Sequence, residues 1–295
     1  IIQRLIKNEQ KNKAYELVIE IRKYFKKELE NNNSKQNNLS YKDTIFLARE
    51  MISIFSKDKQ YKNAIEESIL FLKNNQKNHF YNTLKEQIFI FSDKIIEKRA
   101  IVDFDFPITN KQFNANTFFN YKSLKKYNTD DINYVINIYN KLIQHDIAKN
   151  ESKLKLADIN YNILNDLDNA YQLYDQLETK NIDISFKASI NKIDILITKG
   201  YLDSASALIK NNLEKIETLG FVYKKDQIIN DFHNKNIQIL FYKGNYLEMK
   251  ENLDLLIDNT KLENKYLNDL IEIKNIVLFF NQDEESFKKY SSIQH

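Results

Sequence analysis

The side chains best suited to catalysis or metal binding are few and widely separated. The chain has four histidines, more than 60 residues apart from one another: His79, His145, His233 and His295. None forms the H-E-x-x-H pattern of a zinc-binding helix. His233, beside Phe232, is expected to be a packing or solvated histidine rather than a ligand. Cysteine is absent, which excludes disulfides, cysteine-ligated metals and a cysteine nucleophile.

Phosphate-binding and nucleophile motifs are also missing. The three glycines lie far apart, so no Walker loop and no G-x-G-x-x-G loop can form. No Gly-x-Ser-x-Gly sequence marks a serine nucleophile. No cofactor and no metal are therefore expected.

One carboxylate pair leaves an enzymatic hypothesis open. Asp103 and Asp105 are two residues apart in the irregular segment 101–115, and paired carboxylates can bind a cation or exchange protons. The favoured interpretation is an extended stretch in which Phe104 and Phe106 are buried and both carboxylates face water. An ordered concave pocket around the pair would be needed for catalysis.

The charge balance argues against nucleic acid. The chain carries 44 Lys and Arg against 41 Asp and Glu, a net charge of +3. Nucleic-acid readers present strongly basic surfaces, whereas the lysine pairs of this chain have acidic residues close by. No nucleic acid is expected, although a helical-repeat RNA binder remains an alternative. No window of about 18 apolar residues predicts a membrane span.

The elements that position these side chains are predicted from composition. Three glycines and one proline in 295 residues cannot supply the turns of a sandwich, barrel or doubly wound sheet. A hydrophobic content of 42% is enough for a core. The predicted fold class is therefore all-α.

A turn pattern recurs along the chain and predicts short helices in antiparallel pairs. The sequences N-D-L-D-N-A at 165–170, G-Y-L-D-S-A at 200–205 and G-N-Y-L-E-M at 244–249 align with one another. A further turn at Thr129-Asp130-Asp131 leads to Val135, and K-Q-Y-K-N-A at 59–64 repeats the pattern. The small or apolar residue that follows each of four of these turns, and is expected to pack between helices, then falls at 135, 170, 205 and 249, in steps of 35, 35 and 44 residues. In this register Asp130 and Asn165 stand where other turns have glycine. Self-similarity at such a period indicates a repeat architecture.

The pattern turn-x-aromatic/Leu-x-x-Ala resembles that of tetratricopeptide repeats. The best matches are Gly200/Leu202/Ala205 and Lys59/Tyr61/Ala64. The resemblance implies an α-solenoid of stacked antiparallel helix pairs in a right-handed superhelix. We expect a degenerate helical array over 1–100, an irregular joint over 101–115 and a second array over 116–295.

In that family the first helix of each pair lines a concave face that binds peptides or proteins. The resemblance therefore implies a non-enzymatic scaffold with a protein or peptide partner. Long polar side chains on that face could satisfy the backbone donors and acceptors of an extended peptide. The positions transferred onto this register are Asn120, Lys155, Asn162, Asp194, Thr198, Asn234, Gln238 and Tyr242.

An alternative is a peptide-gated regulatory domain of a larger protein. A DNA-binding helix-turn-helix ahead of Ile1 would favour it, and a secretion signal there would favour a scaffold in the bacterial envelope. The compartment is left open between the cytoplasm and, if a leader was removed before Ile1, the bacterial periplasm. The oligomeric state is not determined by the sequence.

Overall fold

The computed structural model describes most of the chain. The described residues are 4–5, 8, 10, 12–21, 41–74, 80–97, 101–102, 125–177, 181–220, 222–259, 267–280 and 283–294. The carboxylate pair Asp103 and Asp105, most of the predicted joint over 101–115 and the predicted groove residue Asn120 lie outside the described residues.

The described part of the chain is helical apart from its turns and two paired strands, β1 (Ile101–Val102) and β2 (Lys125–Lys126). Helical residues also occur at 4–5 and 12–21. The helices are α3 (Tyr41–Lys57), α4 (Tyr61–Asn74), α5 (Tyr81–Glu97), α6 (Thr129–Gln144), α7 (Lys149–Ile159), the π-helix η1 (Asn160–Leu164), α8 (Leu167–Asp175), α9 (Ile182–Thr198), α10 (Leu202–Thr218), α11 (Lys225–Lys243), α12 (Tyr246–Asn259), α13 (Leu267–Phe279) and α14 (Glu284–Gln294). The all-α prediction is confirmed.

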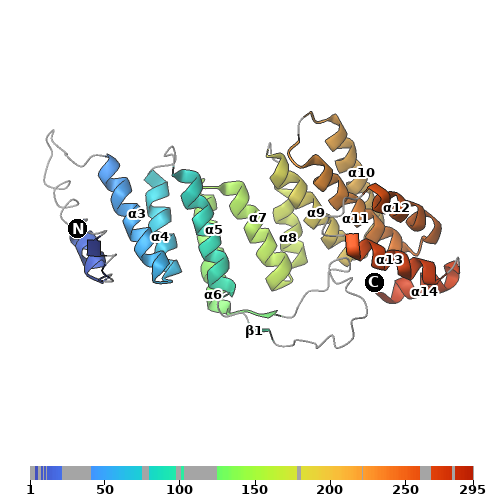
Figure 1. Cartoon of the computed structure of the whole chain (residues 1–295), viewed down its shortest axis with the longest axis horizontal. Coiled ribbons are helices and arrows are strands. Elements are labelled where there is room, and N and C mark those ends of the chain that lie inside the picture. Colours follow the sequence, from blue (N-terminus) through green and yellow to red (C-terminus); the bar gives the residue numbers. More distant parts are fainter. Residues whose placement is uncertain are drawn as a thin grey trace. The chain divides into compact units, whose positions relative to one another are not determined.

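Helices that follow one another in the sequence pack against one another, and Figure 1 shows them side by side within each part of the chain. The contacts divide the chain into two compact units. The first contains residues 1–101 and 126–149, and the second contains residues 102–125 and 150–295. Helix α6, which the predicted division placed in the second array, belongs by its contacts to the first unit.

The turns between paired helices share one backbone conformation. Lys59, Asn165, Gly200 and Gly244 all have φ between 53° and 76°, the left-handed region. At Gly200 the peptide N–H donates to the carbonyl of Ile197, and the next N–H, that of Tyr201, donates to Leu196. This is the Schellman arrangement that ends many helices, and it repeats around Lys59 and Gly244. The local turn signal was therefore sufficient to place these helix ends.

The residue predicted to pack after each turn is buried. Ala64, Ala170, Ala205 and Met249 are all 0% exposed. Each lies five residues after a left-handed residue, and its N–H donates to the carbonyl of the residue just before the helix. A small or flexible side chain here lets neighbouring helices approach closely.

The predicted register was wrong for the turn at 129–131. Asp130 is not a turn residue: it lies in the first turn of α6, and Asn128 caps this helix by accepting from the N–H of Asp131 at 3.0 Å. The N–H of Ile132 donates to the carbonyl of the cap residue Asn128, as the N–H of Ala170 donates to that of Asp166, so Ile132 rather than Val135 is equivalent to Ala170. Ile132 and Val135 are both buried. Asp130 and Asp131 are of the same residue types as those in the other turns, but they lie in the first turn of α6. Their negative charges interact favourably there with the positive end of the helix dipole.

A second repeated contact joins successive pairs in the second unit. Lys199, just before Gly200, forms an ion pair with Asp168 at the start of α8. Lys243, just before Gly244, forms the same contact with Asp203 at the start of α10, at 2.6 Å. Both aspartates are mostly exposed, so each pair contributes little energy, but the two contacts place the same positions of successive pairs together.

The end of the second unit is held by aromatic packing across the turn at Gly244. Phe287 meets Phe241 and Tyr246 edge to face, and α14 contributes Phe287 and Tyr290 to this core. As a result α14 lies against Gly244 so closely that a Cβ added to this glycine would come within 3.0 Å of the Lys288 main chain.

Replacing Gly244 with alanine is expected to lower the free energy of unfolding by about 1–3 kcal/mol, because φ is +66° and the methyl group would displace α14. Gly220→Ala is the matched control, since nothing lies within 4 Å of its added Cβ, and it should change stability by less than about 0.5 kcal/mol. Urea denaturation measures both. Equal effects of the two changes would contradict the close packing of α14.

Candidate functional site

The predicted groove residues lie on the first helices of three successive pairs in the second unit. Lys155 is on α7, Asn162 on η1, Asp194 and Thr198 on α9, and Asn234, Gln238 and Tyr242 on α11. Asn162 and Thr198 are exposed and Lys155 and Tyr242 are partly buried. Asp194, Asn234 and Gln238 are 8%, 8% and 2% exposed, which is low for polar side chains. We call the polar side chains on these helices the first-helix face.

The first helices of the three pairs can be aligned position by position. Asn191, Asp194 and Thr198 on α9 correspond to Lys235, Gln238 and Tyr242 on α11, each 44 residues later. The same positions on the preceding helix are Lys155, Asp158 and Asn162, each 36 residues before α9. The turn residues Asn165 and Gly200 are only 35 apart. The π-helix η1 accommodates the extra residue.

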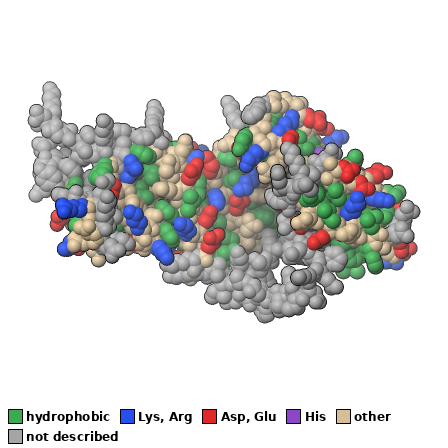
Figure 2. Space-filling view, in the orientation of Figure 1, with side chains coloured by type: hydrophobic (Ala, Val, Ile, Leu, Met, Phe, Trp, Pro, Cys, Tyr) green, Lys and Arg blue, Asp and Glu red, His purple; other side chains and the backbone are tan. Residues whose placement is uncertain are grey.

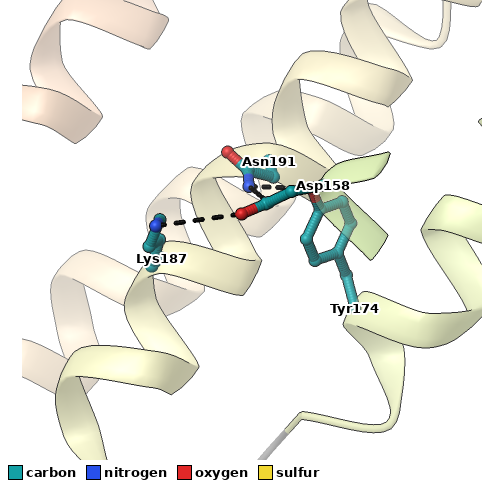
Figure 3. Close-up of polar contacts among 4 residues, drawn as sticks. All are labelled: Asp158, Tyr174, Lys187 and Asn191. Carbon is teal, nitrogen blue, oxygen red and sulfur yellow. Dashed lines mark hydrogen bonds and ion pairs between the residues drawn. The ribbon is translucent and has the colours of Figure 1, made fainter. Parts of the chain in front are cut away.

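Asp158 is the centre of a polar cluster that the sequence did not predict (Figure 3). One carboxylate oxygen accepts from the Tyr174 hydroxyl on α8 at 2.6 Å and from the Asn191 amide on α9 at 3.1 Å. The Asn191 amide also donates to the Tyr174 hydroxyl at 2.9 Å. Lys187 approaches the other carboxylate oxygen at 3.9 Å. The cluster therefore joins three helices, and its proton donors already satisfy the carboxylate.

Two tyrosines on or beside this face are held in their neutral form. Burial and the nearby Asp158 raise the pKa of Tyr174, and burial and the nearby Asp194 raise the pKa of Tyr161. Both side chains are at most 6% exposed. A buried phenolate beside a carboxylate would be strongly unfavourable.

Alkali is therefore expected to destabilise the protein. An unfolded tyrosine loses its proton near pH 10, whereas folded Tyr161 and Tyr174 keep theirs. As the pH rises through about 10 the unfolded state is therefore stabilised relative to the folded state, and the free energy of unfolding falls. Titration of phenolate absorbance should show that these tyrosines ionise only together with loss of helical circular dichroism. Tyr174→Phe should shift that step to higher pH. Gradual ionisation without unfolding would contradict the prediction.

A second contact of the same kind joins α9 to α11. Lys235 forms an ion pair with Asp194 at 2.5 Å, with side chains only 14% and 11% exposed. The lysine also donates to Gln238 at 3.3 Å. Asp194 thus occupies on α9 the position that Asp158 occupies on α7, and Lys235 occupies on α11 the position of Asn191 on α9. In both cases a donor on one helix pair binds an aspartate on the preceding helix pair.

These contacts divide the predicted groove residues by role. Asp194 binds Lys235 and so joins α9 to α11, whereas Gln238 accepts from the same lysine within α11. Thr198 donates its hydroxyl to the main-chain carbonyl of Asp194 at 2.8 Å. The sequence missed Asp158, because one π-helical residue shifts its position relative to the turn. Asn191 and Lys235 are separated by the 44-residue step between repeats, so the sequence could have identified them as equivalent positions.

Asn234 differs from its neighbours because its amide has no hydrogen-bond partner among the described residues. Both the amide nitrogen and the amide oxygen are buried and unpaired. Asn234 lies on α11, one helical turn before Gln238. Buried amide groups are almost always paired in proteins, so this residue calls for an explanation.

The other candidate sites give weaker support for a function. A cavity of about 260 Å³ between α11 and α12 is lined by His233, Asn252 and Leu255 among others. Burial lowers the pKa of His233, so its imidazole is neutral at pH 7. The described residues contain no group of three or more His, Asp or Glu side chains placed to hold a metal ion. None of the described helices is long and apolar enough to cross a membrane.

Charge on the described surface is mixed. On the face drawn in Figure 2, lysine and acidic side chains are interspersed over the helices. This distribution matches the small net charge of the whole chain. It is unlike the single-sign surface typical of nucleic-acid readers.

Comparisons of the chain with family models, with curated proteins and with solved structures find no match. The resemblance to tetratricopeptide repeats therefore stays a prediction from the turn pattern.

Proposed function

We propose that the protein is a non-enzymatic scaffold that binds a peptide or protein segment on the first-helix face of the second unit. In this proposal the helix pairs form a tetratricopeptide-like solenoid, and the first helices line its concave side. The recurring turns, the buried residues that follow them and the repeated lysine–aspartate contacts support the repeat architecture.

The observation that carries the binding proposal is the set of polar side chains at equivalent positions of the first helices, among which Asn162 and Thr198 are exposed. Exposed polar side chains can donate to and accept from the backbone of an extended segment. Asp158 and Asp194 bind donors on the following helix pair, and these contacts keep the first helices in place.

The experiment is affinity capture from a lysate of the source organism, followed by mass spectrometry. The blocking variant is Asn162→Arg/Thr198→Arg, because both side chains are exposed on the first-helix face and neither belongs to the buried ion pair. The matched control is Gln172→Arg/Asn211→Arg, which adds the same charge at exposed positions of the second helices α8 and α10.

A partner retained by the wild type and by the control, but lost by the blocking variant, is the expected result. Equal retention by all three proteins would place binding elsewhere on the chain and contradict the proposal.

A further inference from the structure

We propose that the cavity between α11 and α12 is a second binding site, which takes one aromatic side chain of a partner protein, a tyrosine or a tryptophan. The site goes beyond the proposed function, because it lies on the other side of α11 from the first-helix face. Residues two apart on an α-helix lie about 200° apart around its axis. His233 and Asn236 line the cavity, whereas Lys235 and Gln238, two residues after each of them, belong to the first-helix face.

The size of the cavity fits one side chain. Its volume is about 260 Å³. A cavity of roughly 150 Å³ can hold benzene, and pockets for drug-sized molecules measure roughly 300–1,000 Å³. The volume therefore suits a phenol or indole ring rather than a larger ligand. Leu255, which lines the cavity, is 64% exposed, so the cavity lies at the protein surface.

The preceding helix pair fills the equivalent place with a ring of its own. Asn230 lines the cavity, and its equivalent on α9, 44 residues earlier, is Phe186. Phe186 is 1% exposed and packs in a core cluster with Ile193, which is the equivalent of the cavity residue Ile237. On α11 the shorter asparagine stands in place of the phenylalanine, and a cavity is present beside it. A ring supplied by a partner thus takes the place that Phe186 has in the preceding pair.

The polar groups of the cavity favour a ring that carries a hydrogen-bond donor. Asn230, His233 and Asn236 are partly buried, and their side chains form no hydrogen bond with another described residue. Asn252 donates its amide to the main-chain carbonyl of Glu248 at 2.7 Å, which leaves its oxygen as an acceptor. No Lys, Arg, Asp or Glu is among the described residues that line the cavity, so an uncharged ligand suits it. A tyrosine hydroxyl or a tryptophan N–H can donate to these acceptors, and a phenylalanine cannot.

The probes are p-cresol and indole, which carry the rings of tyrosine and tryptophan, and toluene, which has a ring without a donor. Nuclear magnetic resonance of the chain with isotope-labelled histidine follows binding, because there are four histidines and His233→Gln identifies the signal of His233. At least one of p-cresol and indole should shift that signal, with a Kd of about 1 mM. Toluene should bind about tenfold more weakly, because it leaves the polar groups of the cavity unpaired.

Asn230→Phe copies the residue of α9 and should fill the cavity. It should keep the helical circular dichroism of the wild type and weaken the binding of p-cresol and indole at least about tenfold. Asn211→Phe adds the same ring at an exposed position of α10 and is the matched control, which should leave binding unchanged. Asn162→Arg/Thr198→Arg should also leave it unchanged, so the test is independent of the proposed function.

Two tripeptides, acetyl-Gly-Tyr-Gly-amide and acetyl-Gly-Trp-Gly-amide, test whether the ring can belong to a partner protein. The tripeptide that carries the preferred ring should shift the His233 signal as the free ring does, and its exclusion would overturn the assignment to a partner's side chain.

Three other results would overturn the inference. They are no shift of the His233 signal with either p-cresol or indole, binding of toluene as tight as that of the two probes, and equal binding by Asn230→Phe and the wild type. The toluene comparison uses the wild-type chain, so it decides the matter even if Asn230→Phe does not fold.

Discussion

Ala205→Arg is expected to lower the free energy of unfolding by about 4 kcal/mol or more. Ala205 is 0% exposed, and it belongs to a core cluster with Ile193, Ile209 and Phe232. An arginine there would force the helices apart and bury a charge without a partner. The thermal midpoint should fall by about 10 °C or more.

The chain provides a close control for this change. Ala207 is on the same helix α10, two residues later, but its side chain is exposed. Ala207→Arg makes the same substitution in the same helix and should shift the midpoint by no more than about 2 °C. An unchanged midpoint for Ala205→Arg would mean that the other face of α10 packs against the neighbouring helices, and the turn-based register would fail with it.

Lys235→Met is expected to lower the free energy of unfolding by about 3–5 kcal/mol, because it removes the ammonium partner of a carboxylate that is only 11% exposed. The double variant Asp194→Leu/Lys235→Met should recover most of that loss, since an apolar pair of similar size replaces the ion pair. Urea denaturation of the wild type, both single variants and the double variant completes a double-mutant cycle, which gives the coupling free energy between the two side chains.

The matched control is the exposed pair Lys289–Glu285, whose side chains are 72% and 81% exposed at a distance of 2.7 Å. Lys289→Met should change stability by less than about 1 kcal/mol, because solvent screens this pair. If Lys235→Met were as mild as Lys289→Met, the contact between α9 and α11 would not hold the two helices together.

Both variants bear on the binding proposal as well as on stability. Asp194 and Lys235 are expected to act by holding α9 and α11 in place, so their loss would weaken partner binding indirectly through the fold. Asn162 and Thr198 are exposed, and replacing them changes the surface while leaving the ion pair intact.

The helix ends and the packed residues after the turns could be predicted from the sequence. Gly200 and Gly244 tolerate the left-handed conformation, and Asn165 does so more readily than most residues. Ala170 and Ala205 are small enough for close helix contact. These properties depend on a few neighbouring residues, so the sequence is sufficient to locate them. The prediction went wrong at Asp130, because acidic residues are as suitable for the first turn of a helix as for the residue before it.

By itself, the sequence determined an all-helical chain, the positions of most of its turns and the residues packed behind them. Only the tertiary structure decided which polar side chains meet. Asp158, Asn191 and Tyr174 come from three helices, and a single π-helical residue brings the first of them into register. Asp194 and Lys235 are 41 residues apart in the sequence, and the burial of their contact depends on how α9 and α11 pack. The unpaired amide of Asn234 was also revealed only by the structure. Whether a side chain finds a hydrogen-bond partner depends on all the helices packed around it, and the local sequence does not determine that packing.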